Sequence, residues 1–136
     1  MRSSGKLSLA VLALGCGFAT TLFGGDMAPF IKEAQALFEH GDYNASRDLC
    51  EVMLQREPKA VAAQEILAKT RRQLQRLSRE NWEYGTLLES VNRVEEAKQY
   101  WHRASFYVRP GDHYYDWVKE RLEHYEGIGA TAAVDH

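Results

Sequence analysis

The chain has 136 residues, of which 45% are hydrophobic and 26% are charged, and its formal net charge is −2. This length and balance predict one globular domain. The slightly negative charge excludes a general polyanion binder, so nucleic acid is not an expected partner. Two cysteines, Cys16 and Cys50, do not make a disulfide framework.

Residues 1–25 form the first predicted element, a targeting segment. Arg2 and Lys6 precede a stretch from Leu7 to Gly25 that contains no charged residue. A basic start followed by an apolar stretch is typical of an export signal. We therefore expect the domain to lie outside the cytoplasm, in the periplasm or at the outer-membrane face of a bacterium.

Three fates of this segment stay open. Cleavage after Ala19 would give a mature chain that begins at Thr20. The sequence that ends at Cys16 resembles a bacterial lipobox, although it departs from the usual pattern, and lipidation there would supply an acyl anchor. The third fate is an uncleaved signal anchor, because the run approaches the roughly 20 apolar residues that span a bilayer.

The domain, residues 26–127, begins with two predicted helices. Asp26 caps the first helix and Gly41 ends it in the left-handed conformation. Asp42 caps the second helix, which we expect to run to about Glu57. The predicted inward residues of the two helices are Phe30, Ala34, Leu37, Phe38, Tyr43, Ser46, Leu49, Cys50, Met53 and Leu54.

A long helix is expected from about Lys59 to Ser90, because no helix breaker occurs between Pro58 and Gly85. Apolar residues recur through it at alternating steps of four and three, the a/d seam of a heptad pattern. The seam residues are Ala63, Leu67, Thr70, Leu74, Leu77, Asn81, Tyr84, Leu88 and Val91. A kink near Ser78 or Gly85, or a break at Ser78, stays open.

Two shorter helices complete the predicted domain. A turn at Asn92 leads to a helix that ends near Val108, and Asp112 caps a last helix that ends at Gly127. The predicted inward residues of the first of these helices are Val94, Ala97, Trp101, Ala104 and Ser105. The last helix contains Tyr114, Tyr115, Trp117, Val118, Leu122 and Tyr125. We expect the tail, residues 128–136, to be disordered.

A helical-hairpin pattern occurs twice in these elements, at residues 30–58 and 81–110. Cys50 follows the turn residue Gly41 by nine positions, and Trp101 follows Asn92 by nine. With their small residues, turns and closing prolines, the two copies resemble the tetratricopeptide repeat. The long helix accounts for a spacing of 51 residues between copies, where the family has 34. The resemblance implies an all-α fold, a short solenoid of helical hairpins with one long central helix. An ordinary helical bundle is the alternative.

Proteins of that family mostly bind other proteins in a groove lined by the first helix of each hairpin. The resemblance places eight residues at this groove: Ile31, Gln35, Phe38, Glu39, Trp82, Glu83, Thr86 and Glu89. Trp82 is the strongest candidate because large amphipathic side chains anchor interfaces, and core packing is its alternative role. The groove positions lack the Lys and Asn pairs with which some members clamp a carboxylate.

Tyr114 and Tyr115 belong to an aromatic run from Tyr100 to Trp117 whose rings cannot all point inward on two helices. Some of these rings must be exposed or meet a partner. Most of them would pack the last two helices together with one or two tyrosines exposed, and a protein docking face that includes Tyr114 and Tyr115 is the other possibility. As an alternative function, exposed rings would stack on glycan or peptidoglycan.

We expect no catalytic residues, cofactor or metal site, and therefore no enzyme. The sequence shows no Gly-rich phosphate loop, two-cysteine motif or catalytic triad, and the pair Glu120 and His124 has no third ligand at a recognised spacing. The sequence predicts an exported interaction or scaffold module. It would serve as an accessory or assembly subunit of a cell-envelope complex for secretion, pili, motility or outer-membrane assembly. Its partners would be other envelope proteins, and it would meet the membrane only through the N-terminal segment.

Overall fold

The computed structural model describes residues 26–127. The predictions for residues 1–25, Cys16 included, and for residues 128–136 lie outside this range. The described part of the chain is all helical, as predicted, and contains five helices. They are α2 (Ala28–Glu39), α3 (Tyr43–Arg56), α4 (Val61–Ser90), α5 (Val94–Tyr107) and α6 (Tyr115–Glu126).

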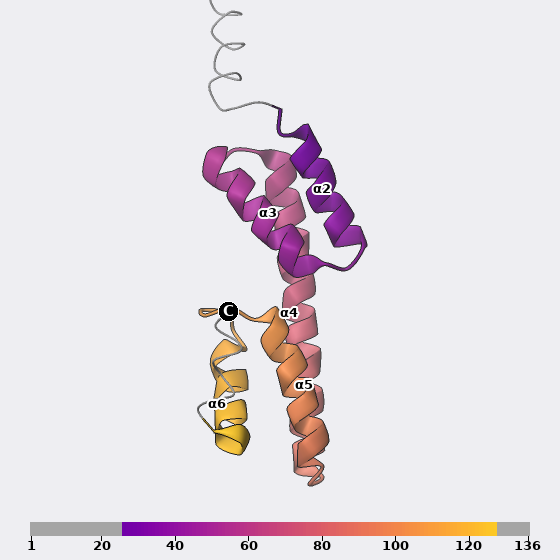
Figure 1. Ribbon diagram of the computed structural model, residues 1–136, viewed down its shortest axis with the longest axis vertical. Helices are drawn as coiled ribbons and strands as arrows, with labels where there is room; N and C mark the ends of the chain where they lie inside the picture. The colour runs from indigo at the N-terminus through magenta and orange to yellow at the C-terminus, as the bar shows by residue number, and fades with distance from the viewer. Residues whose placement is uncertain (1–25, 128–136) are drawn as a thin grey trace, which may run out of the picture.

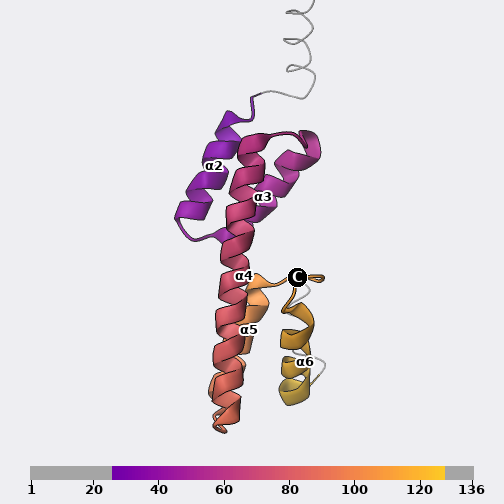
Figure 2. The same cartoon turned by 180° about the vertical axis from the view of Figure 1, so that it is seen from behind.

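Helix α4 is the axis of the molecule, and two groups of helices pack along it. Figure 1 shows α2 and α3 on one half of α4, and α5 and α6 on the other half. The view from behind, in Figure 2, shows the same division. We call α2, α3 and the first half of α4 the N-terminal unit, and the second half of α4 with α5 and α6 the C-terminal unit.

Each unit has its own hydrophobic core. The core of the N-terminal unit comprises Ala34, Cys50, Met53, Ala63, Ile66 and Leu67. The core of the C-terminal unit comprises Ala97, Trp101, Ala104, Val118 and Leu122, with Trp82 and Leu88 of α4 packed against it. Because α4 borders both cores, the two units are joined by a continuous helix.

Buried hydroxyl groups connect the three helices of the N-terminal unit. Ser46 Oγ in α3 donates to the backbone oxygen of Ala34 in α2, at 2.9 Å. The same Oγ lies 3.3 Å from Thr70 Oγ1 in α4, which donates to the backbone oxygen of Ile66. Buried polar groups are stable when paired in this way, so these bonds fix the positions of α2 and α3 relative to α4.

The two helical hairpins have the same backbone turn. After α2, Gly41 N–H donates to Phe38 O and Asp42 N–H donates to Leu37 O, at 3.0 and 2.9 Å. After α4, Asn92 N–H donates to Glu89 O and Arg93 N–H donates to Leu88 O, both at 2.9 Å. This bonding is the Schellman motif, which requires a left-handed residue just past the helix. Gly41 and Asn92 have φ of 80° and 62°, so the predicted turn residues are confirmed.

The helices that follow these turns also match. α3 and α5 each contain 14 residues and begin directly after the turn. Their buried positions correspond at the observed spacing: Ser46 with Ala97, Cys50 with Trp101, and Met53 with Ala104. The small residues Ala34 and Gly85, which occupy equivalent places in the preceding helices, are both buried.

The prediction of one long helix is confirmed, since α4 runs unbroken from Val61 to Ser90. The predicted seam is buried as far as Leu74. Beyond Leu74, Leu88 still packs against the core of the C-terminal unit, whereas Tyr84 and Val91 are exposed. Ser78 and Gly85, which are not seam residues, are buried. A straight helix drifts by about 20° per heptad relative to a strict seven-residue repeat, so the buried face rotates away from the predicted one.

Two further predictions concern helix starts. Asp42 caps α3, because its Oδ1 accepts from Ala45 N at 3.4 Å. The predicted cap of α6 by Asp112 is wrong, since α6 begins three residues later at Tyr115. Asp112 instead closes the preceding turn, where its Oδ2 accepts from Arg109 N at 2.7 Å.

Some side chains predicted to point inward lie at the surface. Phe30 is about half exposed. Trp117 is also about half exposed, and it belongs to the aromatic run whose rings were not all expected to point inward. Tyr43, Leu49 and Leu54 of α3 are partly buried. A three-helix unit covers only one side of each short helix, and residues at the edge of the inward face therefore keep contact with water.

Candidate functional site

Ile31 and Gln35 lie at a shallow hollow between α2 and α4. Its other lining residues on α4 include Glu65, Lys69 and Arg72. Gln35 is already engaged, because its Oε1 accepts from Lys69 Nζ at 2.5 Å and its Nε2 donates to Glu39 at 2.8 Å. Ile31 packs against the core of the N-terminal unit.

Phe38 belongs to the hairpin turn. Its ring makes an edge contact with Tyr43, with centroids 5.4 Å apart. Lys69 Nζ lies 4.4 Å from the centre of the same ring, a cation–π contact. Phe38 is thus held between α3 and α4, and Glu39 beside it is exposed.

Trp82 packs into the C-terminal unit. Its ring centroid lies 6.2 Å from that of Trp101 in α5 and 5.8 Å from that of Trp117 in α6. It is partly buried. The structure therefore gives Trp82 the packing role that the sequence left as the alternative.

The other predicted groove residues of α4 differ in their contacts. Glu83 and Thr86 are exposed. Glu89 accepts a hydrogen bond of 2.7 Å from Tyr125 Oη in α6, and this bond raises the pKa of Tyr125. Arg121 lies 3.6 Å from the other oxygen of Glu89. Glu89 thus fastens α6 to α4.

The eight predicted groove residues do not meet in one groove. Lys69, beside Gln35, and Trp82 are 13 positions apart on α4, which is about 20 Å along a helix. One set lies in the N-terminal unit and the other in the C-terminal unit. The structure brings together Ile31 with Gln35, and separately Trp82 with Glu89 at the α6 side of α4.

Tyr115 is buried and Tyr114 is partly buried. The Tyr114 ring contacts His113 and Trp117, with centroids 4.8 and 5.5 Å apart. Within the aromatic run from Tyr100 to Trp117, the exposed large rings are Phe106 and Trp117. A paired surface of Tyr114 and Tyr115 does not form.

An apolar stripe at the end of α4 was missed as a site. Tyr84, Leu87 and Val91 are 57%, 61% and 59% exposed. At spacings of three and four residues they share one face of the helix. Tyr100 of α5 stacks on Tyr84 with centroids 5.5 Å apart and extends the surface. We call Tyr84, Leu87 and Val91 the distal stripe. The heptad pattern assigned two of these residues to the core, and this assignment hid the stripe in the sequence.

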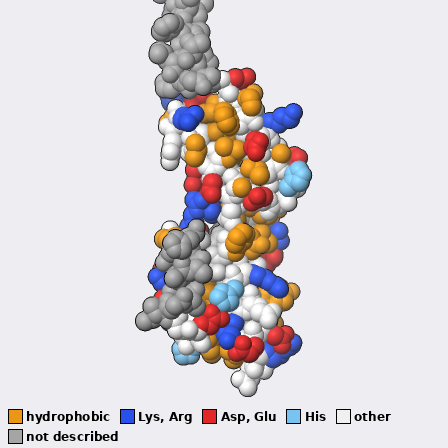
Figure 3. All heavy atoms as spheres, viewed as in Figure 1, with side chains coloured by type: hydrophobic (Ala, Val, Ile, Leu, Met, Phe, Trp, Pro, Cys, Tyr) orange, Lys and Arg blue, Asp and Glu red, His pale blue; other side chains and the backbone are white. Residues whose placement is uncertain are grey.

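α2 and α3 also carry exposed apolar side chains, among them Phe30 and Val52. Figure 3 shows hydrophobic side chains gathered over these two helices, with charged side chains of both signs around them. Scattered apolar exposure of this kind is common on protein surfaces. The distal stripe differs because its members are consecutive on one helical face.

Three further features of the described residues concern metal ligands, the thiol of Cys50 and membrane-spanning helices. Residues 26–127 contain no group of three His, Cys, Asp or Glu side chains placed to hold a metal ion. Cys50 is buried, and burial raises the pKa of its thiol, with the charge of Glu51 as a second cause. Over this same range no helix is both long enough and apolar enough to cross a membrane.

No protein family, curated protein or solved structure matches the chain.

Proposed function

We propose that this chain is an exported interaction module that binds another protein of the cell envelope. The observation that carries this proposal is the distal stripe. The distal stripe has three neighbouring apolar side chains that are each more than half exposed to water. Burying this apolar surface against a partner lowers the free energy. Amphipathic helix faces with anchors at such spacings are a common mode of protein recognition.

The fold supports an interaction role over an enzymatic one. The second helices of the two hairpins are held by identical turns, and both cores are apolar. Arrays of stacked helical hairpins present extended surfaces for binding. We propose a scaffold or assembly role of the tetratricopeptide type, within a secretion, pilus, motility or outer-membrane complex. The export signal predicted for residues 1–25 is the reason for placing it in the envelope.

A variant of the stripe tests the proposal. Leu87→Lys puts a charge at the centre of the stripe, while Gln99→Lys adds the same charge at an exposed position of α5. Tagged wild type and both variants are purified from crosslinked cells, and the recovered proteins are identified by mass spectrometry. We expect one set of envelope proteins with wild type and Gln99→Lys, and its loss with Leu87→Lys.

Two outcomes would reject this function. One is recovery of the same proteins with Leu87→Lys as with wild type. The other is recovery of no envelope protein from any sample. Circular dichroism of the purified variants checks that both remain folded, so a loss of binding is not a loss of structure.

A second candidate function is glycan binding, and the exposed ring of Trp117 beside Tyr114 and His113 favours it. Aromatic faces of this kind stack on sugar rings. A pull-down on purified peptidoglycan tests it with Trp117→Ala and, as a matched control, Phe106→Ala at another exposed ring. Glycan binding requires retention of the wild type and loss with Trp117→Ala alone.

A further inference from the structure

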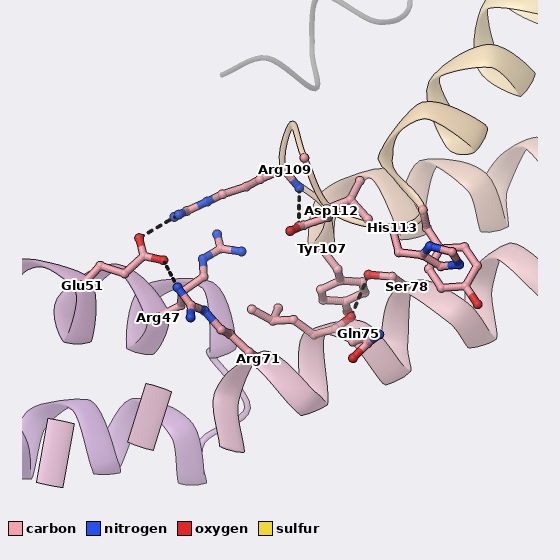
Figure 4. A pocket seen from close by; sticks show the side chains of 13 residues that line it. Arg47, Glu51, Arg71, Gln75, Ser78, Tyr107, Arg109, Asp112 and His113 are labelled. Carbon is pink, nitrogen blue, oxygen red and sulfur yellow. Dashed lines mark hydrogen bonds and ion pairs between the residues drawn. The ribbon is translucent and has the colours of Figure 1, made fainter. Parts of the chain in front are cut away.

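A cavity of about 350 Å³ lies where the two units meet. It is lined by α3, by the middle of α4 and by the loop between α5 and α6, and Figure 4 shows the side chains that surround it. Three guanidinium groups line it, from Arg47, Arg71 and Arg109. The lining carboxylates are Glu51 and Asp112, so positive charge exceeds negative charge in the wall.

Arg47 is the unusual member of this group, because it is only 7% exposed. Arginine is rarely buried without partners. Within residues 26–127 the Arg47 side chain donates one hydrogen bond, from Nε to Asp48 Oδ1 at 3.4 Å. Its two terminal nitrogens carry four further N–H donors, and none of the described residues accepts a hydrogen bond from them.

The neighbouring carboxylates are engaged by the other two arginines. Glu51 accepts from Arg109 Nη1 at 2.9 Å and from Arg71 Nη2 at 3.4 Å, one bond to each oxygen. Asp48 pairs with Arg109 as well. Asp112 Oδ2 accepts from the backbone N–H of Arg109. Figure 4 shows the ion pairs that join Glu51 of α3 to Arg71 of α4 and to Arg109 of the loop.

The pKa shifts of Arg47 and Arg109 are consistent with a shortage of negative charge in the cavity. Burial lowers the pKa of Arg47, and the nearby charges of Glu51 and Asp112 offset this only in part. Burial and the charge of Arg47 likewise lower the pKa of Arg109. An added negative charge in the cavity would oppose both effects.

We propose that this cavity is a binding site for an organic anion, whose carboxylate or phosphate group accepts hydrogen bonds from the terminal nitrogens of Arg47. Arg71 and Arg109 flank the anion as further cations. The planar fork of a guanidinium matches two oxygens of a carboxylate or phosphate. Tyr107, His113 and Tyr114 line the cavity too, and they give the remainder of the ligand an aromatic wall. The volume falls near the lower end of the roughly 300–1,000 Å³ typical of small-molecule sites.

Malonate, inorganic phosphate and a tetraglutamate peptide are the probes for this site. Binding to the purified chain is measured by calorimetry and by the melting temperature, with sodium chloride at equal ionic strength as the reference. We expect at least one probe to bind and to raise the melting temperature above that reference. Preference for malonate or phosphate assigns a small anion as the source, and preference for the peptide assigns an acidic protein segment.

Two substitutions test the role of the arginines. Arg47→Met keeps an unbranched side chain and removes the guanidinium donors, and it is expected to weaken binding by about tenfold or more. Arg71→Gln is expected to weaken binding by a smaller factor. Arg76→Gln makes the same change five residues further along α4, on an exposed residue that pairs with Glu80, and should bind as the wild type does.

Three results would overturn the anion site. They are no binding of any probe beyond the chloride reference, equal binding by wild type and Arg47→Met, and an equal loss in Arg76→Gln. A second readout protects the test against misfolding: because Arg47 is buried with incomplete pairing, Arg47→Met should melt no lower than the wild type in the absence of anion. This site is independent of the distal stripe, so either proposal can fail without the other.

Discussion

Trp101 lies directly against the backbone of Gly85 in the neighbouring helix. A Cβ atom added at position 85 would lie 2.3 Å from Trp101 Nε1, and Trp101 is completely buried. Gly85→Ala should therefore destabilise the protein, because overpacking costs about 1–3 kcal/mol and exceeds or offsets the gain of about 1 kcal/mol in helix propensity. The free energy of unfolding in urea measures this effect.

The same change in a Trp101→Ala background provides the control. Alanine lacks all the ring atoms that the added methyl group would meet. Gly85→Ala should then cost less than in the wild type, or stabilise the helix. A Gly85→Ala protein that is clearly more stable than the wild type in the original background would contradict the close contact.

Cys50 occupies the place of Trp101 in the other hairpin, and it makes stability depend on pH. Burial raises the pKa of its thiol, followed by the charge of Glu51, while a hydrogen bond with Ser46 and the charge of Lys69 lower it. A raised folded pKa means that the fold favours the neutral thiol. The contribution is complete below the unfolded pKa of about 8.5 and is lost as the pH rises above it.

The expected result is a free energy of unfolding that falls between pH 8 and pH 10, and a smaller fall in Cys50→Ala. Mass spectrometry of the peptide that contains Cys50 gives a second measurement. A thiol reagent should leave this residue unmodified in the folded protein and modify it in denaturant. Rapid modification of the native protein would show that Cys50 is accessible.

At the scale of elements, the two Schellman turns determine how each hairpin closes. Gly41 has φ of 80°, and open space surrounds the position of a Cβ atom there. Gly41→Val should cost about 1–2 kcal/mol through backbone strain alone. Gly41→Asn should cost less, because asparagine occupies the equivalent position 92. Thermal unfolding of the two variants tests the turn, and equal stability of Gly41→Val and wild type would exclude a left-handed residue there.

Local sequence signals predicted these turns and the long helix, whereas the wrong predictions depend on tertiary packing. Gly41, Asp42 and Asn92 act through bonds to residues within five positions, so their roles are visible in the sequence. The exposed faces of Tyr84 and Val91 depend on where α5 and α6 lie. The cavity beside Arg47 combines residues up to 67 positions apart, and no pattern in one segment reveals such a meeting.

At the scale of the whole molecule, α4 and a small set of polar contacts join the two units. Arg109 of the loop pairs with Asp48 and Glu51 of α3, and Asn44 Nδ2 donates to Phe106 O at 3.0 Å. Partly exposed ion pairs contribute at most about 1 kcal/mol each. The mechanical continuity of α4 is therefore the main coupling, and its midpoint near Ser78 is the place to test it.

Ser78→Pro should separate the two units. Ser78 is buried in the middle of α4, and its Oγ donates to Leu74 O at 2.7 Å. Proline in a helix interior removes a backbone donor and clashes with the preceding turn, at a cost of about 3 kcal/mol or more. Hydrogen exchange followed by mass spectrometry should show α2 and α3 exchanging together with α5 in the wild type. In Ser78→Pro the amides of the two units should exchange at different rates.

Ser78→Ala, which keeps the helix, should retain the single rate. If the units of the wild type already exchange independently, α4 is a passive connection and each three-helix unit is stable by its own core.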